Sequence, residues 1–186
     1  MTNEQVLVEQ VLVEQWLDEV VIGLNLCPFA SKPRSKGQIR FVLSTSSTDV
    51  DLLTEFDQEI RLLESTPAKE IETTIIIVPA MLADFEQYNQ FLDLVDDVIY
   101  HNKWDGLFQV ASFHPDYCFA DTHPDDSENL TNRSPFPLLH LLREESMEKA
   151  LANMASPDEI FKRNIKAMAS LSIDKIKKLF PYLKLS

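Results

Sequence analysis

Glycine, cysteine and long apolar runs are scarce in this sequence, and each scarcity excludes a class of protein. The three glycines stand far apart, so neither the G-x-G-x-x-G dinucleotide motif nor a Walker A phosphate loop can be present. The two cysteines cannot build a disulfide framework. No run of about 18 apolar residues occurs, so a transmembrane helix is not expected.

Basic residues are also in deficit. The chain has 17 Lys and Arg against 30 Asp and Glu, a formal net charge of −13. A surface of this sign repels nucleic acid and anionic membranes, so neither is an expected partner. The opening residues "MTNEQVLVEQ" lack the basic region of a signal peptide, which predicts a cytoplasmic protein with reduced cysteines.

The remaining composition is that of an ordinary globular domain. The 186 residues are 45% hydrophobic and 25% charged, and we predict a single domain over residues 1–186. The pentapeptide "VLVEQ" occurs twice in tandem, at 6–10 and 11–15. We interpret the repeat as part of a buried helix. The alternative is a second apolar edge that contacts another subunit of a homo-oligomer.

Hydrophobic periodicity predicts an α/β fold. Helices are predicted at 3–26, 47–66 and 83–102, separated by strands at 39–46, 72–79 and 107–114. Further helices are predicted at about 136–154, 157–170 and 173–180. Helix-length connections favour parallel strands, so we expect a small, mainly parallel three-stranded sheet covered by helices, with a C-terminal helical segment. A ferredoxin-like α+β fold is the alternative, but no fourth strand is recognisable.

His114 stands at the end of the third predicted strand and is followed by Pro115. Ligands of open α/β sheets bind beyond the carboxyl ends of the strands, and imidazole titrates near neutral pH. These features make His114 a candidate general acid or base, with Asp116 as the group that orients it. The alternative is a histidine that only hydrogen-bonds a carbonyl of the loop.

A second group of candidates surrounds a predicted helix start at Ser134, a natural N-cap residue. Helix N-termini attract anions, and Arg133 lies directly before this one. Further along, His140, Arg143 and Glu144 fall on one helical face. His140 is therefore a candidate second proton carrier, with Glu144 as a group that could hold Arg143 in place.

Together these positions predict a pocket for a small anionic molecule, formed by the third strand end, the 115–135 loop and the following helix. His114 and His140 are expected on the same side of the sheet, within reach of one ligand. Arg34, in a loop bounded by prolines, is a further candidate for contact with the anion. The complete set of expected ligand contacts is Arg34, Asn129, Asn132, Arg133, Ser134, Arg143 and Glu144.

Two other chemistries have weaker support in the spacing. A divalent metal is conceivable, with His114, Asp116, His123 and His140 as candidate ligands, but no compact metal-binding spacing is present. No metal is therefore predicted, and the identity of any other cofactor stays unknown from the sequence. Cys27 stands at a helix end, where the negative end of the dipole raises a thiol pKa. We interpret Cys27 as a packing residue, with thiol-dependent redox chemistry as the alternative.

Three segments together resemble a known family. They are "VIGLNLCPFA" (21–30), "FHPDY" (113–117) and "TNRSPFPLLHLLRE" (131–144). They are similar to the DUF1415 family of uncharacterised bacterial proteins, and the similarity covers nearly the whole chain. The resemblance implies a cytoplasmic bacterial protein and brings no established activity.

The leading hypothesis from the sequence is an enzyme that acts on a small anionic metabolite by histidine acid–base chemistry. One alternative is a non-catalytic ligand-binding or adaptor protein. The other is a redox protein that uses Cys27.

Overall fold

Four strands form one mixed sheet in the computed structural model, which describes residues 3–152 and 157–183. They lie in the order β1 (Ile39–Leu43), β2 (Thr73–Ile77), β4 (Leu138–Arg143) and β3 (Phe108–Phe113). β1 and β2 are parallel, and β4 runs antiparallel to both of its neighbours, β2 and β3. The three strands predicted from the sequence therefore point the same way, with β4 inserted between two of them.

The prediction of a three-stranded sheet is thus wrong, because the sheet contains a fourth strand, β4. Where the sequence predicts one helix over 136–154, the chain first forms β4 and then the short helix α5 (Glu144–Leu151). Pro135 and Pro137 favour extended conformations at the residues that precede them, which directs the chain into a strand. The ferredoxin-like alternative does not fit either. From β1 to β4 the order is β-α-β-α-β-β, whereas a ferredoxin-like fold requires β-α-β-β-α-β.

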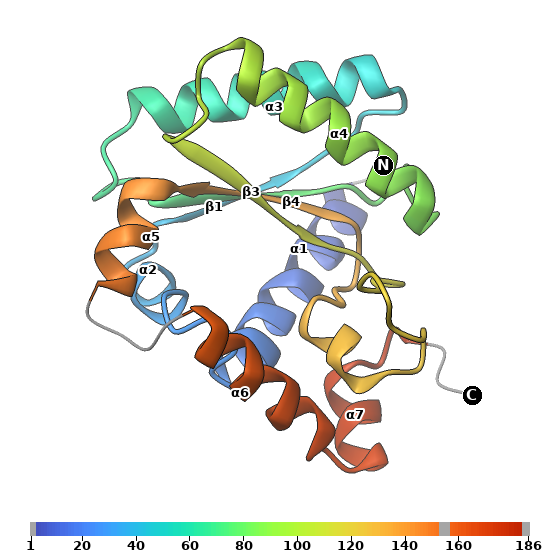
Figure 1. Ribbon diagram of the computed structural model, residues 1–186. Helices are drawn as coiled ribbons and strands as arrows, with labels where there is room; N and C mark the ends of the chain where they lie inside the picture. Colours follow the sequence, from blue (N-terminus) through green and yellow to red (C-terminus); the bar gives the residue numbers. More distant parts are fainter. Residues whose placement is uncertain (1–2, 153–156, 184–186) are drawn as a thin grey trace.

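Helices α3 (Asp49–Ser65) and α4 (Phe85–His101) cover one face of the sheet (Figure 1). Each begins at a side-chain cap, because Thr48 and Asp84 accept a backbone N–H of the first turn. Their apolar stripes pack on the sheet residues that point toward them. The buried set includes Leu52, Phe56, Ile60, Leu63, Ile76, Tyr88, Phe91, Val95, Leu139 and Leu141.

The opposite face is covered mainly by α1 (Asn3–Trp16) and its π-helical continuation Leu17–Ile22. α7 (Ile173–Leu179) lies further from the sheet on this side, and its Leu179 belongs to the same apolar cluster. The sheet residues buried beneath these helices include Ile75, Ile77 and Leu138. Two further helices, α2 (Ser31–Ser35) and α6 (Pro157–Ala169), lie on this side of the sheet together with α5 (Figure 1). No helix in the described part of the chain is long and apolar enough to cross a membrane.

Strand alternation assigns each side chain of β4 to one face of the sheet. Leu139 and Leu141 belong to the core beneath α3 and α4, whereas Leu138 packs on the α1 side. His140 therefore points to the α1 side, and Arg143 points to the side of α3 and α4. The two residues are separated by the sheet instead of sharing a helical face.

Candidate functional site

The entry to β4 is held by bonds within the chain, and no helix begins at Ser134. The Ser134 side chain is fully buried, and its hydroxyl donates to the Phe136 carbonyl at 2.6 Å. Arg133 donates to the carbonyls of Tyr117 and Pro124 at 3.2 and 2.6 Å. The helix N-terminus that was expected to attract an anion is therefore absent, and the Arg133 side chain joins two parts of the preceding loop.

The Arg143 side chain contacts the C-terminal end of α3, which lies on the same side of the sheet. Its Nη2 donates to the carbonyls of Leu63 and Thr66 at 2.6 Å each, and to the Ile71 carbonyl at 3.1 Å. Leu63 and Thr66 lie at the C-terminal end of α3, where the helix dipole favours a cation. Glu144 begins α5. Arg143 therefore fastens the connection between α3 and β2 to the sheet.

His140 lies on the other face, in the strand at the middle of the sheet. Its Nε2 is 2.7 Å from the Thr73 hydroxyl, and its ring centroid is 6.2 Å from that of Phe113. The residue is only partly buried, yet protein atoms surround the ring closely enough that desolvation lowers its pKa to about 4. His114 contacts Tyr88 of α4, at 5.1 Å between ring centroids. The expectation that both histidines share one side of the sheet is therefore wrong.

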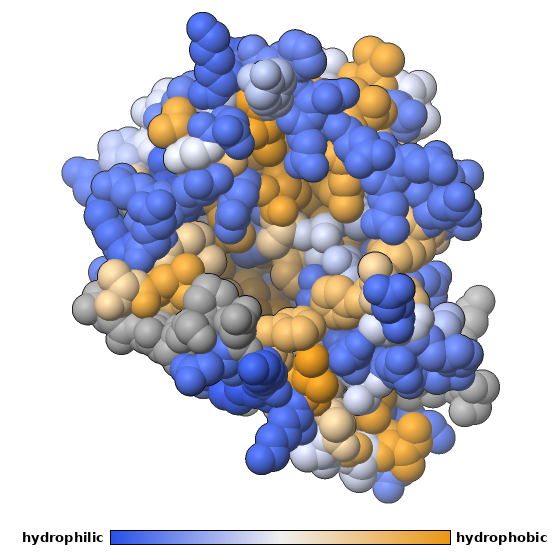
Figure 2. All heavy atoms as spheres, viewed as in Figure 1, coloured by the Kyte–Doolittle hydropathy of each residue, from blue (hydrophilic) through white to orange (hydrophobic). Residues whose placement is uncertain are grey.

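A hollow opens on the α1 side of the sheet, between the strands, α5 and α6, and largely apolar side chains surround it (Figure 2). Four side chains on this face of β3 and β4 are only partly buried, although helices lie below them. They are Ala111, Phe113, His140 and Leu142, and Ala111 is the register partner of His140. Because side chains of one face share this partial exposure, the helices cover that part of the sheet incompletely.

Arg34 is engaged in ion pairs with the first helix. Its guanidinium donates to Asp18 at 2.7 and 2.8 Å and to Glu14 at 3.0 Å, and its Cζ lies 5.7 Å from the centroid of the Phe41 ring. These side-chain bonds to carboxylates raise its pKa above the ordinary value. Arg34 therefore holds α2 against α1.

Cys27 follows the π-helical segment and packs against the apolar cluster on the α1 side. Burial raises the pKa of its thiol above the ordinary value, which favours the protonated and less reactive form. Cys27 and Cys118 are both free in the structure. The packing interpretation of Cys27 thus has more support than redox chemistry.

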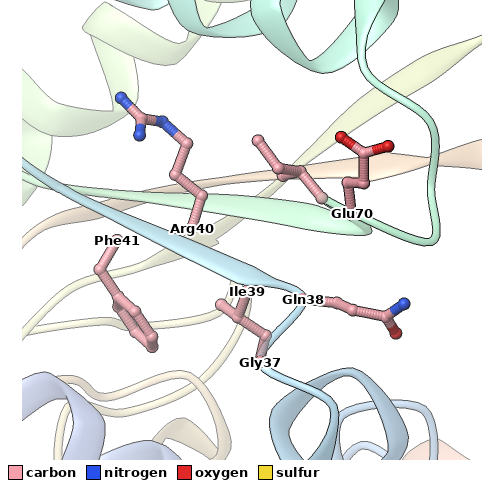
Figure 3. A pocket seen from close by; sticks show the side chains of 7 residues that line it. Gly37, Gln38, Ile39, Arg40, Phe41 and Glu70 are labelled. Atoms are coloured by element: carbon pink, nitrogen blue, oxygen red, sulfur yellow. The ribbon is translucent and has the colours of Figure 1, made fainter.

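A shallow recess lies beside the start of β1, lined by residues 37–41, Glu70 and Ile71 (Figure 3). Arg40 and Phe41 leave the strand in opposite directions there. Arg40 is already paired, because its Nε and Nη2 donate to the Glu59 carboxylate at 2.7 and 2.9 Å. No residue singled out by the sequence faces this recess.

His114 cross-links two loops from a fully buried position. Its Nε2 bonds the Leu82 carbonyl at 3.0 Å, and its Nδ1 accepts the backbone N–H of Asp116 at 2.9 Å. Burial is the main cause that lowers its pKa below the ordinary value. With both ring nitrogens engaged, the geometry favours the alternative that the sequence left open, a histidine that stabilises the loop. Asp116 is exposed, and its backbone N–H makes the contact to the ring.

Asn129 organises the long loop after β3 from a fully buried position. Its Oδ1 accepts the N–H of Phe119 and the hydroxyl of Thr122 at 2.9 and 3.0 Å, and its Nδ2 donates to the His123 carbonyl at 2.8 Å. Asn132 is used similarly, because its Nδ2 donates to a carbonyl of β3 at 3.1 Å. Both side chains bind the protein's own backbone, where the sequence predicted contacts to a ligand.

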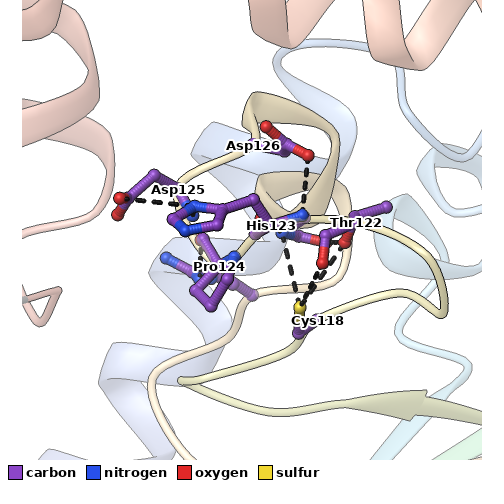
Figure 4. Close-up of polar contacts among 8 residues, drawn as sticks. Cys118, Thr122, His123, Pro124, Asp125 and Asp126 are labelled. Atoms are coloured by element: carbon purple, nitrogen blue, oxygen red, sulfur yellow. Dashed lines mark hydrogen bonds and ion pairs between the residues drawn. The ribbon is translucent and has the colours of Figure 1, made fainter.

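Side chains in the acidic part of this loop make polar contacts with other residues of the same loop (Figure 4). The exposed His123 ring lies 3.5 Å from the Asp125 carboxylate, and its backbone N–H donates to Asp126 at 2.8 Å. Among the described residues, no three His, Cys, Asp or Glu side chains are grouped so that they could hold a metal ion. The histidines proposed as ligands are distributed over both faces of the sheet and the loop.

A family model described as a protein of unknown function (DUF1415) matches residues 9–178. The chain belongs to this family. The match confirms the resemblance, and all three segments that carried it lie inside the matched range. No curated protein and no solved structure matched the chain.

The three segments of the DUF1415 family occupy distinct places in the fold. Residues 21–30 begin in the last two residues of the π-helical segment and continue beyond it on the α1 side, 113–117 leave the end of β3, and 131–144 contain β4. Sequence reasoning missed Thr73, which orients His140, and Ala111, which lies beside it. The alternation of Thr73 with the buried Ile75 and Ile77 was the available signal, since it places all three on one face.

Proposed function

We propose that the protein binds a small molecule in the hollow on the α1 side of the sheet, with His140 as the polar group that faces it. The observation that carries this proposal is a partly exposed histidine on a central strand, on the same side of the sheet as a hollow with apolar walls. Small-molecule sites have this character, because they are concave, mostly apolar and contain a few oriented polar groups.

Binding has more support than catalysis. A general base works best when its pKa lies near the operating pH, whereas the pKa of His140 is about 4. His114, the other candidate base, has both ring nitrogens in hydrogen bonds to the backbone. These contacts support the non-catalytic ligand-binding alternative more than the enzyme hypothesis from the sequence, and ligand binding is therefore the proposal.

A hollow also fits a small ligand better than it fits the flat contact of an adaptor. The redox alternative has less support, because burial raises the Cys27 pKa and the thiol form is a poor nucleophile.

The test is a protein-observed NMR screen with a panel of small aromatic and aliphatic compounds. We expect some of them to shift the amide signals of residues 111–113 and 140–142. Ala111→Phe, which fills the space beside His140, should abolish these shifts. Ala80→Phe adds the same ring at an exposed loop position and should leave them unchanged. If no compound perturbs these amides, or if Ala111→Phe has no effect, the proposal is wrong.

A further inference from the structure

The contacts of His140 determine which of its ring nitrogens carries the proton. Thr73 Oγ1 contacts both His140 Nε2 and the Leu141 carbonyl. A hydroxyl has one hydrogen, and a carbonyl can only accept, so the Thr73 hydrogen points to Leu141. Thr73 Oγ1 must then accept from His140, which places the ring proton on Nε2. In the neutral ring Nδ1 is left with a lone pair and no hydrogen.

Nδ1 has no hydrogen-bond partner among the residues that the structure describes, and His140 as a whole is only partly buried. Desolvation keeps the ring neutral at pH 7, since its pKa is about 4. At that pH Nδ1 can accept a hydrogen bond but cannot donate one, and the ring carries no charge that would attract an anion.

In the described part of the chain, no arginine brings its charge to His140 through a hydrogen bond. Each of the arginines already donates to a carbonyl or carboxylate of the chain. They are Arg34, Arg40, Arg61, Arg133, Arg143 and Arg163. The apolar neighbours of His140 on its face of the sheet, Ala111, Phe113 and Leu142, add no charge either.

We propose that the ligand of the hollow is an uncharged, mainly apolar molecule that donates one hydroxyl or N–H hydrogen bond to His140 Nδ1. This inference rests on the proposed function and narrows its ligand class. It replaces the anionic molecule predicted from the sequence with a neutral hydrogen-bond donor.

Phenol and anisole test the inference directly, because they differ in whether the oxygen carries a hydrogen or a methyl group. We expect phenol to bind about fivefold more tightly than anisole, the ratio that one neutral hydrogen bond supports. Benzoate, the anionic probe, should bind more weakly than phenol. Affinities are measured by NMR titration of the amide signals of residues 111–113 and 140–142.

Two further measurements tie the preference to the ring nitrogen. In the wild-type protein, the ¹⁵N signal of His140 Nδ1 should shift on addition of phenol and stay in place with anisole. His140→Phe keeps an aromatic ring and should bring both compounds to equal affinity. Thr73→Val removes the acceptor that fixes the proton on Nε2, so its ¹⁵N spectrum should show both tautomers.

The outcomes separate the two proposals. If phenol and anisole bind the hollow equally in the wild-type protein, or benzoate binds most tightly, the neutral-donor inference is wrong while the binding site stands. If neither phenol nor anisole perturbs the amides of residues 111–113 and 140–142 while another compound of the panel does, the neutral-donor inference is wrong. If no compound perturbs them, the site itself is refuted, and the inference falls with it. The ¹⁵N measurement on the wild-type protein does not depend on the stability of any variant.

Discussion

Arg143 offers the sharpest test of how the structure reassigns a residue that the sequence placed in a binding site. Arg143→Met removes the guanidinium while keeping a long apolar side chain. We expect the variant to fold and to be less stable, because the carbonyls of Leu63 and Thr66 lose their donor.

The magnitude follows from the number of hydrogens available. All three bonds come from Nη2, which has two hydrogens, so the equivalent of two charge-assisted bonds is lost. At about 1.5 kcal/mol each, the low end for a partly exposed group, this costs about 3 kcal/mol. Arg143 Nε is buried without a partner, and its removal returns about 1 kcal/mol. The expected net loss is about 2 kcal/mol, or about 4–8 °C in the melting temperature of a domain of this size.

Urea unfolding followed by circular dichroism measures this loss. Arg61→Met is the matched control, because Arg61 pairs with Asp57 at an exposed position, and exposed ion pairs contribute little to stability. Arg143→Lys keeps the charge and should recover part of the loss. If Arg143→Met is no less stable than Arg61→Met, Arg143 does not stabilise the connection between α3 and β2. The ligand-binding role predicted from the sequence would then be the better explanation.

Three further perturbations test other parts of the structure. Burial lowers the pKa of His140 from 6.5 to about 4 and also lowers that of His114. The neutral rings therefore contribute their full stability above about pH 6.5, and it is lost as the pH falls toward 4, with about 3 kcal/mol of the loss from His140. Urea titrations at pH 7, 6 and 5 should show this decline, and a constant free energy of unfolding would contradict it. Gly23→Ala places a Cβ 2.3 Å from the Glu19 carbonyl oxygen, and it should cost at least about 2 kcal/mol of stability in the same assay. Asn129→Ala should loosen the loop after β3 and speed hydrogen exchange of residues 118–129 by at least about tenfold, since three side-chain bonds are lost. Unchanged exchange would mean that Asn129 does not organise the loop.

The parts of the fold that follow a strong local pattern could be predicted from the sequence. The apolar run before Pro79 predicts β2, and the stripe Leu52, Phe56, Ile60 predicts α3. In both cases the residues that set the period are the ones that become buried. Local periodicity and tertiary burial agree there, which is why the prediction was right.

Strand β4 could not be recognised by the same reasoning. In "LLHLLR" the apolar residues are almost continuous, and a short run of this kind fits a buried strand and a buried helix equally well. Ser134 and Pro135 resemble a helix start, and the spacing of three between His140 and Arg143 fits a helical face. What decides the conformation is pairing with β2 and β3 on both sides, which is a tertiary effect.

That one difference in conformation changes the functional argument. On a helix, His140 and Arg143 would converge on one ligand. On a strand, their odd separation sends them to opposite faces. There Arg143 meets the carbonyls at the end of α3, and His140 meets Thr73 on the α1 side of the sheet. The single acid–base and anion site expected from the sequence therefore separates into structural contacts at His114, Arg133 and Arg143, and one candidate ligand group at His140. Because a neutral His140 can accept through Nδ1, the chemistry that we propose for this site is recognition of a hydrogen-bond donor.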